Sequence, residues 1–131
     1  MTSKDIKDKL FPILEKYKDK VIFVYLFGSA SQDTMQPLSD IDIAVFLSED
    51  IRKSYFDTKL ILYADFCRVL KRNDIDIVVL NTSTNIMLLD EVIRHGLVLY
   101  DRNSDLREDF EVKVLHQAID FKEQRLAILG I

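Results

Sequence analysis

Apolar and polar residues alternate in blocks along this 131-residue chain, and the blocks predict an alternation of helices and strands. From Ser3 to about Lys18, apolar residues recur at the three- and four-residue spacing of an amphipathic helix. Pro12 lies in the middle of this stretch, which suggests that the regular helix begins only near there. Residues 21–27 are then continuously apolar and rich in β-branched and aromatic types, which predicts a buried strand.

The rest of the chain continues this alternation without repeats, low-complexity tracts or a dividing linker. The strand–helix order predicts an α/β fold, a small mixed sheet flanked by helices, formed as one domain over residues 1–131. The expected elements are a short helix at Ser29–Met35, a turn at Pro37–Ser39, a strand at 40–47, a helix at Tyr55–Lys71, a strand at Asp74–Leu80, a helix at Thr84–His95 capped by Thr82, Ser83 or Thr84, a short strand at Leu97–Tyr100, and a helix from Asn103 or Ser104 to about Leu129.

The last of these helices carries apolar residues around an unusually wide arc. A helix of this kind is either enclosed by the core or partly reserved for a partner. The core accounts for about half of these residues, so a partner surface is the second expectation. The residues are Leu106, Phe110, Val112, Val114, Leu115, Ile119, Phe121, Leu126 and Ile128.

A glycine and a serine, Gly28 and Ser29, end the first predicted strand. Glycine permits a close approach of the backbone, and the serine can offer both its N–H and its hydroxyl group to a phosphate. Gly28 and Ser29 are therefore candidate phosphate-binding residues.

Two carboxylates, Asp40 and Asp42, open the second predicted strand, where their spacing places them on one face. Side by side they repel each other, and hard oxygen ligands of this kind suit Mg²⁺ that carries substrate phosphates. A third carboxylate is expected from the strand at 74–80. Asp76 is preferred over Asp74 because it lies deeper in that strand, where an unpaired carboxylate would be costly.

Charge and composition narrow the class of protein. The net charge of −4 argues against a nucleic-acid-binding surface built on bulk positive charge. The single cysteine, Cys67, cannot form an internal disulfide, and His95 and His116 lack the spacing of a zinc site. No apolar run approaches the ~20 residues of a membrane span. We therefore expect a cytoplasmic protein that does not act at a membrane.

The arrangement Gly28-Ser29-x10-Asp40-x-Asp42 resembles the signature of the polymerase-beta-type nucleotidyltransferase superfamily. With Asp76 as the third carboxylate and no second domain, the chain resembles the minimal nucleotidyltransferases, which are antitoxin partners of HEPN-domain toxins. One stretch departs from the family pattern. A small residue, a basic residue and a second glycine usually follow the Gly-Ser pair, whereas this chain has Ala30-Ser31-Gln32-Asp33-Thr34, which leaves less positive charge near the phosphates.

The resemblance implies a polymerase-beta palm-like fold and transfer of AMP from ATP to a protein hydroxyl, typically a tyrosine of the HEPN toxin. The residues themselves indicate how the reaction is supported. Asp40 and Asp42 would bridge two Mg²⁺ ions, Asp76 would complete the shell of the second ion, and Gly28 and Ser29 would hold the β- and γ-phosphates. The three aspartates are thus the predicted metal ligands and catalytic residues.

Two alternatives stay open. One is a small-molecule nucleotidyltransferase of the aminoglycoside-modifying type, which generally needs an added helical domain that this chain lacks. The other is a non-catalytic antitoxin that binds its toxin, although steric binding has no need of three aligned acids. The acceptor, the preferred base and the state of homo- or hetero-oligomerisation are left open by the sequence.

Overall fold

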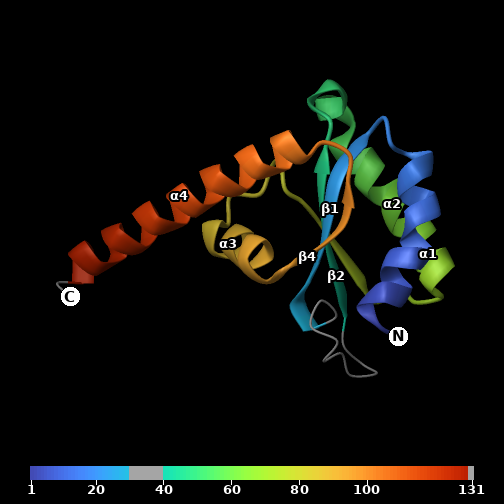
Figure 1. The fold of residues 1–131 in the computed structure, drawn as a ribbon, viewed down its shortest axis with the longest axis horizontal. Helices are drawn as coiled ribbons and strands as arrows, with labels where there is room; N and C mark the ends of the chain where they lie inside the picture. Colours follow the sequence, from blue (N-terminus) through green and yellow to red (C-terminus); the bar gives the residue numbers. More distant parts are fainter. Residues whose placement is uncertain (30–39, 130–131) are drawn as a thin grey trace.

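The computed structural model describes residues 1–29 and 40–129 (Figure 1). The helix and turn expected between Ser29 and Ser39 therefore lie, apart from Ser29, outside the described residues. The elements are α1 (Ser3–Lys16), β1 (Val21–Phe27), β2 (Ile41–Leu47), the 3-10 helix η2 (Glu49–Ser54), α2 (Tyr55–Leu70), β3 (Ile75–Val79), α3 (Ile86–His95), β4 (Leu97–Asp101) and α4 (Ser104–Leu129).

The strands form one mixed sheet in the order β3-β2-β1-β4. β1 runs antiparallel to both β2 and β4, whereas β2 and β3 are parallel because α2 carries the chain from one to the other. The predicted α/β fold with a small mixed sheet is confirmed.

Helices cover both faces of the sheet, as Figure 1 shows, with α1 and α2 on one side and α3 and the start of α4 on the other. Every residue of β1 is buried, which explains why its sequence is apolar without alternation. Isoleucines 41, 43, 75 and 77 point toward α1 and α2, while Ala44 and Phe46 point toward α3 and α4.

α4 is fixed to the sheet through its first turns. The Tyr25 hydroxyl donates to Glu111 (2.6 Å), and Arg107 pairs with Asp101 (2.7 Å). Beyond Ala118 the helix leaves the sheet and projects outward (Figure 1). The apolar residues of α4 are thus divided as expected between core and solvent. The large apolar side chains exposed on it are Val112, Ile119, Phe121, Leu126, Ile128 and Leu129.

Two expectations about helix ends were wrong. α1 is helical from Ser3 with Pro12 inside it, because Thr2 and Asp5 form a reciprocal capping box. Pro12 and Asp8 are both exposed, so water can bond the Asp8 carbonyl that the proline cannot. The cap of α3 is Asn85, whose side chain accepts from the Leu88 N–H (3.1 Å), and none of the residues 82–84.

The N-cap of α4 is Asn103, one of the two expected residues, and its side chain accepts from the Leu106 N–H (3.1 Å). Among the described residues, no helix combines the length and apolar character needed to cross a membrane.

Candidate active site

The predicted site residues come together at one end of the sheet. In the strand pairing, Phe27 at the end of β1 lies opposite Asp42 of β2, and Asp42 lies opposite Asp76 of β3. Paired residues on neighbouring strands point to the same face, so the carboxylates of Asp42 and Asp76 share the face that α3 and α4 cover farther along. Gly28 follows Phe27 directly and completes the group.

Gly28 and Asp42 are in close contact. Gly28 has a φ of +73°, which side chains other than glycine rarely adopt. A Cβ atom built on Gly28 would lie 2.5 Å from Asp42 Oδ2. The backbone at Gly28 therefore favours a residue without a side chain, and any Cβ atom there would displace the Asp42 carboxylate.

We predict that Gly28→Ala damages both the fold and the site. The left-handed backbone costs an L-residue about 1–2 kcal/mol, and the new methyl group also displaces the Asp42 carboxylate. We expect the melting temperature to fall by roughly 5 °C or more and nucleotide binding to weaken. Scanning calorimetry and ATP titration measure the two effects.

Gly28→Asn separates the two causes, because asparagine tolerates positive φ but still carries a Cβ atom. Loss of ATP binding in both variants would identify the clash with Asp42 as the cause. Wild-type binding in both would contradict the contact.

The electrostatics of Asp42 show that three carboxylates are neighbours here. The pKa of Asp42 is raised by partial burial and then by the negative charges of Asp76 and Asp40. Within residues 1–29 and 40–129, no three His, Cys, Asp or Glu side chains already stand in metal-ligating geometry. The three carboxylates are all negatively charged and repel each other. A divalent cation bound between their oxygen atoms would remove this repulsion.

Asp40 lies one residue before β2 and is exposed, so the strand begins at Ile41 and not at residue 40 as predicted. Its position is fixed by the backbone, since the Ile41 N–H donates to the Asp74 carbonyl (3.0 Å). The entrance of β2 is thus tied to the entrance of β3.

Arg72 is more closely connected to the site than its sequence suggested. The basic cluster of Arg68, Lys71 and Arg72 reads as a solvated helix end, but only the first two fit that description. Arg72 Nε donates to Asp74 (2.8 Å), and the pKa of Arg72 is raised by Asp74 and by the charge of Asp40. Lys71 has a φ of 56° and turns the chain at the end of α2, and no sequence pattern announced that turn.

Asp76 was predicted over Asp74 because it was expected to lie deeper in its strand, and that reason was wrong. Asp76 is exposed, because β3 is the edge strand of the sheet and does not bury that side chain. Asp74 lies outside β3 and is engaged by Arg72, which lowers the pKa of its carboxyl. The strand register with Asp42, and not burial, is what places Asp76 in the site.

Ser29 directly follows Gly28 and is half-buried at the same end of the sheet. The stretch from Ala30 to Thr34, which includes Asp33 and departs from the family pattern, lies outside the described residues.

Comparison with known proteins assigns this fold and motif. Residues 8–105 match the family model described as "Polymerase beta, Nucleotidyltransferase". The chain belongs to this nucleotidyltransferase family. The match spans Gly28, Asp40, Asp42 and the whole of β3, so the part of the chain that carries the candidate site is the part that carries the family likeness.

Among curated relatives, this nucleotidyltransferase is 30% identical over 126 residues to the protein adenylyltransferase MntA of Shewanella oneidensis, covering 94% of this chain and 84% of MntA. Solved structures agree. A toxin–antitoxin complex with AMP-PNP contains a chain with a TM-score of 0.73 and 29% identity, with 95% of each chain covered. A tri-AMPylated HEPN toxin of Shewanella oneidensis in complex with its MNT antitoxin gives 0.70 and 25% identity, with 98% of this chain and 97% of that chain covered.

Proposed function

We propose that this nucleotidyltransferase transfers AMP from ATP to the hydroxyl group of a tyrosine of a HEPN-domain toxin, and so acts as an antitoxin. The observation that carries the proposal is the strand register that aligns Asp42 with Asp76 beside the glycine turn at Gly28. The names of the relatives support it, because MntA is called a protein adenylyltransferase and one related complex holds an AMPylated HEPN toxin.

Asp40, Asp42 and Asp76 are the residues that would hold the metal ions. Burial and mutual repulsion already raise the pKa of Asp42, so a cation would relieve an unfavourable interaction in this site. Bound there, two Mg²⁺ ions would neutralise the triphosphate and activate the acceptor hydroxyl.

Gly28 and Ser29 are assigned to the phosphates. The missing Cβ atom of Gly28 lets the backbone after β1 approach a ligand closely, and the N–H and hydroxyl of Ser29 add donors beside it. Arg72 contributes positive charge at the entrance of β2 through its proximity to Asp40.

The proposed reaction is an in-line displacement at the α-phosphorus of ATP. The acceptor oxygen forms a bond to the α-phosphorus while the bond from that phosphorus to the bridging oxygen of the β-phosphate breaks, and pyrophosphate leaves. Asp76 is exposed and can take the hydroxyl proton and pass it to water. The rest of the catalysis is positioning and charge neutralisation, which the rigid sheet provides.

The antitoxin effect follows from the modification. An AMP group adds a bulky anion to the toxin, which would block the toxin's activity. Since the reaction consumes ATP, we place it in the cytoplasm, and we assign it to residues 1–131 as one domain.

The first test is ATP binding to the isolated protein. We predict that calorimetry detects binding in Mg²⁺ or Mn²⁺ and that chelation by EDTA weakens it at least tenfold, because the carboxylates repel the triphosphate without a cation. Asp50→Asn, a change in η2 at the other end of β2, serves as the matched control and should bind like wild type. Equal binding with and without chelator would overturn the metal assignment.

A further inference from the structure

The outer edge of β3 is open. β3 pairs only with β2 in the sheet, and no other strand of the described ranges lies beside it. The Asp74 carbonyl accepts from the Ile41 N–H, and the Leu80 N–H donates to the Val45 carbonyl, so backbone groups of the even-numbered residues face β2. Because these directions alternate along a strand, the N–H and C=O groups of Ile75 and Ile77 point toward the open edge.

A groove runs along this edge between β3 and α2. It consists of a hollow of about 430 Å³ toward Tyr55 and Phe56 and a second of about 240 Å³ toward Leu60 and Tyr63. Lys59 and Ile77 line both hollows, so the two hollows are neighbours along β3, and Asp76 lines the second. We call this feature the β3 groove.

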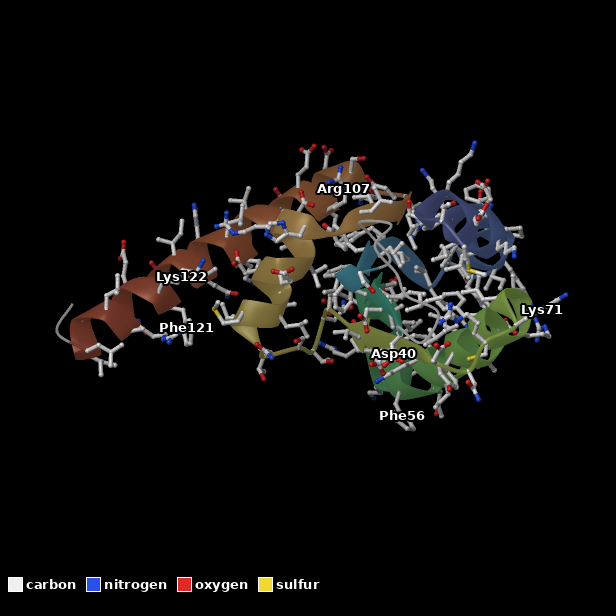
Figure 2. The ribbon with its side chains drawn as sticks, turned by 90° about the horizontal axis from the view of Figure 1, so that it is seen from below. Asp40, Phe56, Lys71, Arg107, Phe121 and Lys122 are labelled. Atoms are coloured by element: carbon white, nitrogen blue, oxygen red, sulfur yellow. The ribbon has the colours of Figure 1, made fainter. Side chains whose placement is uncertain are left out.

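The wall of the β3 groove exposes large apolar side chains on α2. Phe56 is 69% exposed and Leu60 is 50% exposed, and Tyr63 adds a third partly exposed ring. Figure 2 shows Phe56 projecting outward from α2. Together with the open strand edge, these side chains form a surface with both backbone hydrogen-bonding groups and apolar contacts.

We propose that the β3 groove binds an extended segment of the acceptor protein, which joins the sheet as a strand beside β3. The inference rests on the proposed function, since it assigns the acceptor to a polypeptide. A free strand edge selects an extended backbone because only a peptide presents N–H and C=O groups at the matching repeat. A small-molecule acceptor offers no such series.

Strand addition also explains how the hydroxyl group reaches the carboxylates. Successive side chains of the docked segment point to opposite faces of the sheet. Those on the face of Ile75 and Ile77 enter the hollows beside α2, whereas those on the other face lie next to Asp76. A tyrosine or serine opposite Asp76 is therefore delivered to the site while its neighbours hold the segment in register.

Charge favours a partner over a second copy of this chain. The chain carries a net charge of −4, and pairing of two β3 strands would bring the Asp76 carboxylates of both copies to one face. Lys59, which lines both hollows, instead favours a segment with an acidic residue.

The test compares two neighbouring substitutions on α2, Leu60→Glu and Ile61→Glu. Leu60 lines the groove, whereas Ile61 is 43% exposed but lines neither hollow, so it is the matched control. The acceptor in this test is the cognate HEPN-domain toxin. We expect Leu60→Glu to raise the KM for that protein at least tenfold, and Ile61→Glu to leave it at the wild-type value, with equal melting temperatures for both variants.

Hydrogen exchange tests the strand itself without requiring catalysis. In the complex of the Asp42→Asn variant with the HEPN-domain protein, the amides of Ile75 and Ile77 should exchange at least tenfold more slowly than in the free variant. Unprotected amides in the complex, or a wild-type KM for Leu60→Glu, would overturn the proposal that the β3 groove binds the acceptor segment. Amides already protected in the free protein would indicate that a second copy covers the strand edge, which would also overturn the proposal. If the amides are protected in the complex but the wild-type enzyme never transfers AMP to the HEPN-domain protein, the proposed function is contradicted, whereas binding of the segment at the β3 groove is supported.

Discussion

Asp42→Asn is expected to abolish AMP transfer, by roughly 10³-fold or more, while leaving the fold intact. The carboxylate sits between Gly28 and Asp76 and is the residue that all parts of the site share. Its loss removes several kcal/mol of charge stabilisation from the transition state, and each 1.36 kcal/mol corresponds to a factor of ten in rate. Labelled ATP and a competent acceptor measure the rate.

The Asp42→Asn variant should lose activity but should be as stable as the wild-type protein or slightly more stable. The folded-state pKa of Asp42 lies above its unfolded value, so folding favours the protonated carboxyl. The protonated carboxyl contributes its full stability below about pH 3.8, which is the pKa of the group in the unfolded chain. That contribution is lost as the pH rises through the pKa of the folded state. At neutral pH the charged carboxylate therefore destabilises the metal-free protein, and asparagine relieves that penalty.

Melting curves in EDTA check this part. The variant should melt at the wild-type temperature or slightly above it at pH 7, and the difference should shrink toward pH 3. A variant that is inactive because it unfolds would make Asp42 a structural residue and remove it from the site.

The strands could be predicted from the sequence, and the candidate site residues proposed from it, because both depend on local patterns. Continuous apolar residues identify β1, and the Gly28-Ser29 pair with Asp40 and Asp42 at fixed spacing identifies one end of the sheet. Asp76 was reached for a different reason. Its place opposite Asp42 comes from the parallel register of β2 with β3, a long-range pairing that no single segment of the sequence encodes.

Features that depend on long-range contacts or on the conformation of single residues could not be predicted from the sequence. Arg72 meets Asp74 after the left-handed turn at Lys71, which no sequence pattern indicates. Asn85 replaces the expected caps of α3 because the helix begins two residues later than expected, at Ile86. The β3 groove was out of reach altogether, since it depends on which strand ends at the edge of the sheet and on α2 lying along it.

A protein partner, and not a small molecule, is expected to be labelled when this enzyme is incubated with labelled ATP, Mg²⁺ and its cognate HEPN-domain toxin. One or more AMP units should appear on a side chain of that protein, most plausibly a tyrosine, with release of one pyrophosphate per AMP. Mass spectrometry of the partner locates the modification. Robust labelling of an aminoglycoside, with none on the partner, would favour the small-molecule alternative instead.

The projecting part of α4 should contribute to that complex as a second surface. Figure 2 shows Phe121 and Lys122 far from Asp40, so a partner that contacts this part of α4 does so away from the carboxylates. Leu126→Glu, at an exposed apolar position, should weaken the complex at least tenfold and leave ATP binding unchanged. Glu123→Gln, an exposed position on the same helix, is the control and should bind the partner like wild type. A partner that binds but stays unlabelled even in Mn²⁺ would favour the non-catalytic antitoxin. The loss of activity would then be attributed first to the stretch Ala30-Ser31-Gln32-Asp33-Thr34, which lacks the basic residue of the family pattern.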